Sequence, residues 1–335
     1  MLQDRTLRLM RGLRRLFVGI SALLLPVMPG ASLGADAYPD RPIRAIVPFP
    51  PGQGADILMR FLAERLNSQL GQQIVVDNRP GAGGMIGTAL ASRATPDGYT
   101  LYMGSSGPLG ISPSIYKNPG YDPVRDFFPI SNVASVAQVL VTSSSSTFQS
   151  AGELLAAARK RPGEIQYASP GNGTTSHLTM ELLALTSRTK LSHVPYKGSP
   201  AAHLDVIAGR VPVMFDSTPG VLGHIKSGKL RALGVSTAER IRFLPDTPTV
   251  REAGVQGFAT MGWIGLLAPA GTPSSIINRL HSSVLKIIQS PEARQRLDEL
   301  AFAPIGDTPS QFAAFIKSEV ALWAKVVKAS GATVD

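Results

Sequence analysis

Two glycine-rich segments hold the residues of this chain whose types and spacing suit a chemical role. Each follows a short apolar run and precedes an amphipathic one, at residues 48–56 and 169–177. A helix that starts in such a segment presents free N–H groups and the positive end of its dipole, so it can bind a carboxylate without a charged side chain. Glycine lets the backbone come close to a ligand. Gly52, Gly54 and Ala55 are the candidates for this role in the first segment.

The second segment adds hydroxyl groups to the same pattern. Gly173 is followed by Thr174, Thr175 and Ser176, whose hydroxyls can donate hydrogen bonds to an anion. The alternative is that Ser176, like Asp56 in the first segment, only caps its helix and that the glycines only turn the chain. One such loop alone favours that structural explanation. Two of them in one chain favour an anion-binding site.

The sequence lacks the motifs of the common catalytic centres. Its five histidines show no metal-ligand spacing, and no G-x-S-x-G nucleophile motif is present. Residues 223–229 resemble a phosphate-binding loop, but Leu230 stands where a hydroxyl would have to reach magnesium. Gly81, Gly83 and Gly87 approximate a dinucleotide fingerprint, without a ribose-binding acid after it. We therefore expect no catalytic residue, no cofactor, no metal ion, and a protein that is not an enzyme.

Short apolar strands alternate with amphipathic helices along most of the chain, which is typical of an α/β protein. Both glycine-rich loops follow a predicted strand, and ligands of doubly wound sheets bind at the carboxyl ends of the strands. The pattern predicts two such sheets. Strands are predicted at residues 43–49, 74–76, 100–103, 136–141, 165–168, 191–194, 211–215, 230–235 and 263–268. Helices are predicted at residues 55–70, 150–160, 176–186, 201–208 and 221–227, and after the caps Thr272 and Thr308.

The N-terminal residues 1–37 have the order of a secretory signal peptide. Five arginines precede an apolar run at residues 16–25, and Ala35-Asp36-Ala37 forms a small-x-small cleavage site. The alternative is a membrane anchor, but the run is shorter than the ~20 apolar residues that span a bilayer. Arg14-Arg15 also resembles part of a twin-arginine export signal. We expect a periplasmic protein that is not membrane-inserted once mature.

Charge and cysteine content narrow the class of partner. The formal net charge is +10, and a positive field concentrates anionic ligands near a protein. No basic run interleaves with aromatic residues, so we expect no nucleic acid partner. The chain has no cysteine, which excludes a disulfide, a lipidated thiol and a thiol nucleophile.

Several motifs, spread over the chain in order, resemble a known family. They are YPDRPI (38–43), VPFPPG (47–52), DNRPGAGG (77–84), PDGYT (96–100), VPYKG (194–198), PTVREAG (248–254) and APAGTP (268–273). This chain resembles the Bug-type family, the extracytoplasmic binding components of tripartite tricarboxylate transporters. The resemblance covers essentially the whole chain after residue 37.

The resemblance implies a two-lobed periplasmic-binding-protein fold, with two doubly wound sheets joined by two crossover strands. Lobe 1 would comprise residues 38–140 and 263–335, and lobe 2 residues 141–262. A small organic carboxylate would bind in the cleft between the lobes, and a monomeric protein would deliver it to transporter membrane subunits. Binding loops at residues 49–56 and 171–177 carry over by position. The implied ligand-binding residues are Phe49, Pro51, Gly52, Gly54, Ala55, Ser105, Ser106, Gly173, Thr174, Thr175, Ser176, Asp216 and Ser217.

The first loop departs from the family pattern at two positions. Gln53 replaces the usual glycine, and Ala55 replaces a hydroxyl residue, which bears on the identity of the ligand. Phe49 suits core packing as well as a wall of the cleft. Two other functions stay open at this point: a binding module for a sensor kinase, and an exported hydrolase that uses the same cleft.

Overall fold

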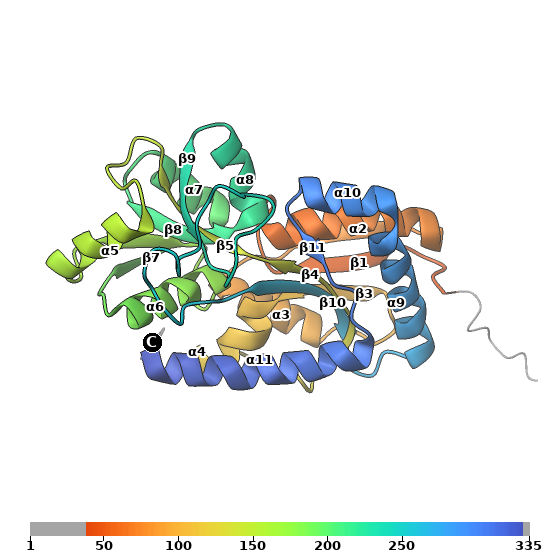
Figure 1. Cartoon of the computed structure of the whole chain (residues 1–335). Coiled ribbons are helices and arrows are strands. Elements are labelled where there is room, and N and C mark those ends of the chain that lie inside the picture. Colours follow the sequence, from red (N-terminus) through yellow and green to blue (C-terminus); the bar gives the residue numbers. More distant parts are fainter. Residues whose placement is uncertain (1–37, 331–335) are drawn as a thin grey trace, which may run out of the picture. The chain divides into compact units, whose positions relative to one another are not determined.

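The computed structural model describes residues 38–330, and the predicted signal peptide at residues 1–37 lies outside this range. Among the described residues, the first sheet has six strands in the order β11-β4-β10-β3-β1-β2 (Figure 1). β1 pairs in parallel with β2 and β3, whereas β10 is antiparallel to β3 and β4. The strands are β1 (Ile43–Val47), β2 (Ile74–Asn78), β3 (Thr100–Ser105), β4 (Phe127–Val136), β10 (Gly262–Pro269) and β11 (Ala303–Pro304).

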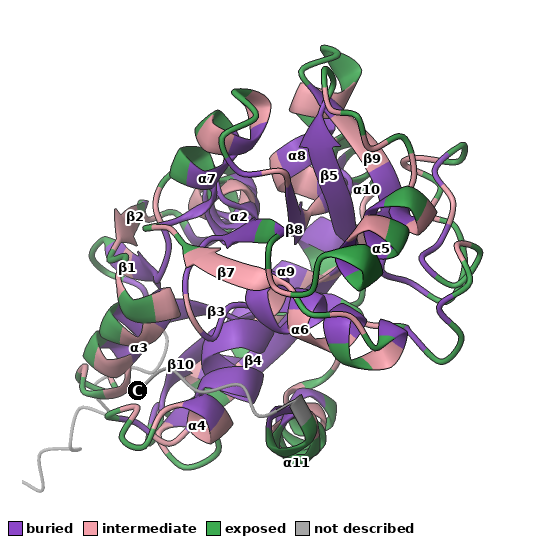
Figure 2. Cartoon of the chain, turned by 90° about the vertical axis from the view of Figure 1, so that its left-hand side faces the viewer, coloured by how far each residue is buried: buried purple, intermediate pink, exposed green. Residues whose placement is uncertain are grey.

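The second sheet of the described chain has five strands in the order β7-β6-β8-β5-β9. β6 pairs in parallel with β7 and β8, and β5 is antiparallel to β8 and β9. β5 and β10 are buried over their whole lengths, and β5 appears in the colour of buried residues in Figure 2. The strands are β5 (Gln138–Ser143), β6 (Gln166–Ser169), β7 (Ser192–Pro195), β8 (Val213–Ser217) and β9 (Leu230–Val235).

Helices cover the faces of both sheets (Figure 1). Those that pack with the first sheet are α2 (Gly54–Leu70), η2 (Ala82–Gly84), α3 (Met85–Ser92), η3 (Gly107–Ile111), α4 (Ser112–Ile115), α9 (Ser274–Gln289), α10 (Pro291–Glu299) and α11 (Pro309–Ser330). Those that belong with the second sheet are α5 (Ala151–Lys160), α6 (Thr175–Ser187), α7 (Ser199–Ile207) and α8 (Thr218–Lys226). We call the first sheet with its helices lobe 1 and the second sheet with its helices lobe 2. The predicted α/β class with two doubly wound sheets is confirmed.

The chain crosses between the lobes twice. It leaves lobe 1 at Ala137, between β4 and β5, and returns through residues 236–261, between β9 and β10. The predicted boundary between residues 140 and 141 falls inside β5, whose pairing with β8 and β9 puts it in the second sheet. The assignment of whole residue ranges to independent lobes stays a prediction.

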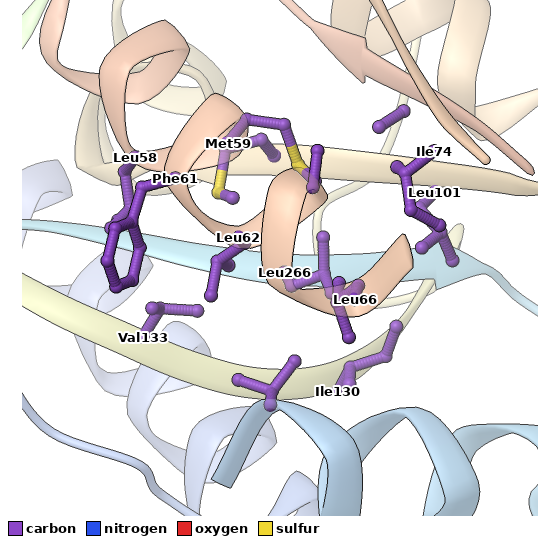
Figure 3. Close-up of a cluster of buried hydrophobic side chains, with 14 of the residues drawn as sticks. Leu58, Met59, Phe61, Leu62, Leu66, Ile74, Leu101, Ile130, Val133 and Leu266 are labelled. Carbon is purple, nitrogen blue, oxygen red and sulfur yellow. The ribbon is translucent and has the colours of Figure 1, made fainter. Parts of the chain in front are cut away.

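The helix α2 shows how the sequence builds lobe 1. Its apolar residues recur three and four positions apart, so they share the face that lies on the sheet. Leu58, Leu62 and Leu66 are fully buried there, next to strand residues that include Leu101 and Leu266 (Figure 3). The helix ends at Gly71, whose φ of 71° is the left-handed cap expected of glycine. This packing fixes the direction in which the N-terminus of α2 points.

Two of the predicted helix caps are confirmed, and a third is wrong. The Ser150 hydroxyl accepts the N–H of Glu153 at 3.2 Å, and the Thr308 hydroxyl accepts the N–H of Gln311 at 3.3 Å. Thr272 does not cap α9. Its hydroxyl donates to the Pro269 carbonyl at 2.8 Å, which holds the turn before the helix instead.

The C-terminal helix α11 bridges the two lobes. It packs on η3, α4 and β4 of lobe 1 and on α6 of lobe 2 (Figure 1). Its Trp323 and Val327 join Ile111, Ile115 and Leu178 in one apolar cluster. Of the helices at residues 38–330, none has the length and apolar character needed to cross a membrane.

Candidate functional site

A small cavity of about 50 Å³ lies between the lobes. Ten of the thirteen residues expected at the binding site line it, and they come from both glycine-rich loops, the end of β3 and the end of β8. These residues are Phe49, Gly54, Ala55, Ser105, Ser106, Thr174, Thr175, Ser176, Asp216 and Ser217. The predicted loops therefore meet in space, although they are far apart in the chain.

The other three expected residues, Pro51, Gly52 and Gly173, are not among those that line the cavity. Gly52 and Gly173 have φ of 85° and 72°, which glycine adopts far more easily than other residues. Their positive φ allows the turns of the two loops without placing a side chain in the cavity.

Six further residues line the cavity: Gln53, Val136, Gln138, Gly262, Trp263 and Ile264. Gln53 lies in the predicted first binding loop, and the other five were not singled out from the sequence. These five lie where the chain crosses between the lobes, at the adjoining ends of β4, β5 and β10. Gln138 offered a signal, because it is a polar residue inside an apolar run. Gly262 and Trp263 gave no such signal, because a glycine and a tryptophan in an apolar segment are what an ordinary buried strand contains.

The first loop is held in shape by a buried carboxylate. Asp56 is 2 % exposed, and its Oδ2 accepts the N–H of Gly52 at 2.9 Å. Asn78 donates to Oδ1 of Asp56 and to the Phe49 carbonyl, each at 2.9 Å. No side chain caps α2, whose N-cap residue is Gln53. The helix N-terminus is thus left for another acceptor, while Asp56 fixes the loop that precedes it.

The second loop has its own internal bonds. The Thr174 hydroxyl caps α6 by accepting the N–H of His177 at 3.4 Å, and it donates to the Gly171 carbonyl at 2.8 Å. Nδ1 of His177 accepts the N–H of Gly173 at 3.2 Å. This bond requires Nδ1 without a proton. Burial, and to a lesser degree the neighbouring His193, lowers the pKa of His177 to about 3, so the imidazole is neutral at ordinary pH.

Three hydrogen bonds join the lobes around the cavity. The Ser106 and Thr175 hydroxyls lie 2.8 Å apart, and Oε1 of Gln53 accepts the N–H of Ser199 at 3.4 Å. The Tyr116 hydroxyl donates to the Asn172 carbonyl at 3.2 Å. Gln53, where the family usually has glycine, thus gives this chain a contact between the lobes.

Helix N-termini from both lobes face the cavity. Gly54 and Ala55 open α2, the Thr174 side chain caps α6, and Ser217 holds the N-cap position of α8 without a side-chain cap bond. Each of these helices places roughly half a positive charge at its N-terminus. Asp216, 2 % exposed, is the acidic side chain among the lining residues, and its Oδ2 lies 2.7 Å from Nε2 of His203. The field of the three helix ends therefore favours an anion.

One hydroxyl in the cavity has no partner. Oγ of Ser217 is buried and makes no hydrogen bond to the described residues. A buried polar group without a partner costs about 1–3 kcal/mol, so such a group is typical of a site that a ligand completes. Ser176, next to it, donates to Oε1 of Gln138 at 3.1 Å and lies 3.4 Å from Oδ1 of Asp216.

A second space of about 230 Å³ adjoins the cavity and shares Phe49 with it. Its walls are the loops at residues 80–84, 170–172 and 195–198. Phe49 is 6 % exposed and lines both spaces, which agrees with the wall role and equally with packing. Among residues 38–330, no group of three or more acidic, histidine or cysteine side chains is arranged to hold a metal ion.

Two lobes joined by crossing segments, with helix N-termini from both facing one cavity, define a two-lobed solute-binding protein. The chain belongs to the tripartite tricarboxylate transporter receptor family, whose model matches residues 58–332. The resemblance drawn from the sequence motifs is thereby confirmed.

Relatives and solved structures agree with this membership. Protein BugT of Bordetella pertussis is 38 % identical over 319 residues, which is 95 % of this chain and 98 % of that protein. Rpa4515 of R. palustris, solved with adipate, has a TM-score of 0.86 at 35 % identity and covers 88 % of this chain and 98 % of its own. MatC of Rhodopseudomonas palustris, solved with bound malate, has a TM-score of 0.82 at 29 % identity, with 87 % and 100 % covered.

Proposed function

We propose that this protein captures a small organic carboxylate in the cavity between its lobes and delivers it to the membrane subunits of a tripartite tricarboxylate-type transporter. The observation that carries the proposal is the meeting of the N-termini of α2, α6 and α8 at one cavity with the unpartnered hydroxyl of Ser217. The ligands of the two R. palustris relatives, adipate and malate, are carboxylates of the size that we propose here.

The carboxylate would accept hydrogen bonds from the backbone at Gly54 and Ala55 and from the hydroxyls of Thr175 and Ser217. These donors need no net charge, because the helix ends supply the positive field. Asp216 also lines the cavity, and its carboxylate is paired with His203. It orients the Ser176 hydroxyl rather than meeting the ligand.

The lobes must separate before a ligand can enter. Small-molecule sites usually enclose about 300–1,000 Å³, and the cavity has about 50 Å³. The bonds from Ser106 to Thr175 and from Gln53 to Ser199 cross between the lobes, so they break when the lobes part. Ligand binding and closure are therefore coupled, with Ala137 and residues 236–261 as the hinge.

Hydrolysis is a poorer explanation of the same cleft. A serine hydrolase places the imidazole between the hydroxyl and the carboxylate. Here Asp216 lies between Ser176 and His203, so the imidazole contacts the acid and not the nucleophile. This order cannot activate the hydroxyl as a nucleophile, and we propose binding without turnover.

Calorimetric titration with mono-, di- and tricarboxylates, adipate and malate included, tests the binding step. We expect saturable binding of at least one of them. Ser217→Ala should weaken it at least about tenfold, since one hydrogen bond to a charged ligand is lost. Thr179→Val is the matched control, because Thr179 also has a buried hydroxyl without a partner among the described residues but lies outside the cavity.

No binding of any carboxylate would refute the proposal, and equal losses in the two variants would refute the role of Ser217. Delivery to a transporter is tested separately, by measuring uptake of the labelled ligand in cells that lack this protein. Unchanged uptake would favour a sensory partner over a transporter.

A further inference from the structure

A second and much larger cavity lies behind the crossing segments. It has about 620 Å³, and its walls come from β4, residues 237–238 and 259–261, β10, α6 and α11. Gly262 and Trp263 line both this cavity and the carboxylate site. The backbone N–H of Trp263 lies 3.4 Å from Oγ of Ser106 in the site, whereas its indole packs against Phe312 and Phe315 of α11. We call this second space the hinge cavity.

The hinge cavity is apolar over most of its wall. Leu182 of α6 faces Phe315, Leu322 and Val326 of α11 across it. At its rim, Met261 and Leu322 are 46 % and 52 % exposed, so the space is open to solvent. Large exposed apolar side chains gathered at an opening are typical of a binding site. The volume suits a small molecule.

The charged side chains that line the hinge cavity in the described part of the chain are both acidic, while the other polar residues there, Asn132, Ser135, Thr237 and Thr260, are neutral. Glu319 is 9 % exposed, and its Oε2 accepts the indole N–H of Trp263 at 2.8 Å and that of Trp323 at 3.2 Å. Asp307 also lines the space. None of the lining residues that the structure describes is a lysine or an arginine, although the chain carries a net charge of +10. The cavity is thus an acidic site in a basic protein.

An acceptor in this wall lacks a partner. Oδ1 of Asn132 is buried and makes no hydrogen bond to the described residues, and Asn132 is 2 % exposed. A carboxylate can accept about four hydrogen bonds, and both indoles end on a single oxygen of Glu319. The unpaired oxygen of Asn132 and the remaining acceptor positions of Glu319 suit a ligand that donates hydrogen bonds. The tryptophan and phenylalanine rings nearby add surfaces that attract a cation within about 6 Å.

We propose that the hinge cavity is a second binding site, for a small organic ammonium ion with an apolar body. Its ammonium group donates to Glu319 and to the amide oxygen of Asn132, and its apolar part packs between α6 and α11. This site differs from the carboxylate site in place, in the sign of its field and in the class of its ligand. It does not depend on the function proposed above.

The two tryptophans of the sequence make the site directly observable. Both line the hinge cavity and both bond to Glu319, so tryptophan fluorescence reports on an occupant there. The probe is 2-phenylethylamine, titrated into the exported protein with no carboxylate present. The neutral 2-phenylethanol and the anionic 3-phenylpropanoate are the comparison ligands. We expect saturable binding of one amine per chain and at least tenfold weaker binding of the alcohol.

Two variants assign the binding to this cavity. Glu319→Gln keeps an acceptor for the indoles but removes the charge, and it should weaken amine binding about tenfold. Leu322→Lys places a cation at the exposed rim and should abolish binding. Leu204→Lys makes the same change at a residue of α7 that is 68 % exposed and far from the lining set, and it should leave binding unchanged.

Three results would overturn the proposal: no saturable binding of the amine up to about 10 mM, equal binding of the alcohol, or equal affinity of the Leu322→Lys and Leu204→Lys variants. Thermal melting of each variant checks that it is folded.

Repeating the titration with a saturating carboxylate separates the two sites. If the amine competes with the carboxylate, it binds in the interlobe cavity and the proposal fails, whereas a missing carboxylate response alone counts against the proposed function.

Discussion

Lowering the pH should destabilise this protein because two stacked imidazoles, the buried His177 and the partly buried His193, support the second binding loop. The ring centroids of His177 and His193 lie 4.0 Å apart, and His193 stacks on Tyr167 at 4.8 Å. Burial lowers the pKa of His177 from 6.5 to about 3 and that of His193 from 6.5 to about 4. A charged imidazole in this stack would also remove the acceptor that Gly173 uses.

The magnitude follows from proton linkage. The folded pKa values lie below the unfolded value of 6.5, so the unfolded chain binds more protons once the pH falls below 6.5. The stabilisation is fully present above pH 6.5 and is lost toward the folded pKa values. Between about pH 7.5 and 5, each imidazole costs about 2 kcal/mol, or about 4 kcal/mol together. Both rings stay mostly neutral in the folded state over this interval, so the result depends little on the folded values.

Urea unfolding at about pH 7.5 and 5 measures the loss directly. The double variant His177→Gln, His193→Gln is the reference, because glutamine can still accept the N–H of Gly173 and cannot be protonated in this range. We expect the wild type to lose about 4 kcal/mol more than the variant between the two pH values. Equal losses would show that the stack is not held neutral and would refute the reasoning.

Two further predictions concern closure and the core. Gly83→Ala should weaken carboxylate binding at least tenfold, because its Cβ would lie 2.0 Å from the carbonyl oxygen of Asn172 in the other lobe. The control is Gly209→Ala, which has a similar φ of 71° with no atom within 4 Å of its Cβ and should bind normally. Equal affinities of the two variants in calorimetry would contradict the closed arrangement of the lobes. Leu62 lies in the fully buried face of α2, so Leu62→Ala should lower the free energy of unfolding by about 2–5 kcal/mol. Leu204 is 68 % exposed, so Leu204→Ala should change that free energy by less than about 0.5 kcal/mol. Comparable urea midpoints for the two variants would show that α2 is not packed as described.

The sequence predicted elements better than it predicted how they meet. Periodic apolar residues located α2 and β9, because hydrophobic faces repeat with the period of the element that buries them. The start of α8 was expected at residue 221, but the helix begins at Thr218. Thr218-Pro219-Gly220 reads as a turn, since glycine has low helix propensity and proline is favourable only in a first turn. One of the helix N-termini at the cavity was therefore missed.

The hinge cavity shows the other limit of sequence reasoning. From sequence alone a tryptophan in an apolar segment is most simply a core residue, and Trp263 and Trp323 are both almost fully buried. Burial alone does not say whether the neighbouring space is filled. That depends on where α11 lies relative to β10 and residues 236–261, which follows from contacts between parts of the chain that are distant in sequence. The acceptor role of Glu319 toward both indoles depends on the position of α11, which the sequence does not show.

The position of β10 has a consequence for the order of folding. β10 lies between β3 and β4 in the first sheet, so these two strands pair with β10 and not with each other. The second sheet is complete at residue 235, whereas the first requires residues 262–269. During synthesis from the N-terminus, lobe 2 can close its sheet while lobe 1 still waits for its central strand. A chain cut short before residue 262 would contain every strand of the second sheet but would lack Gly262 and Trp263, which line both cavities.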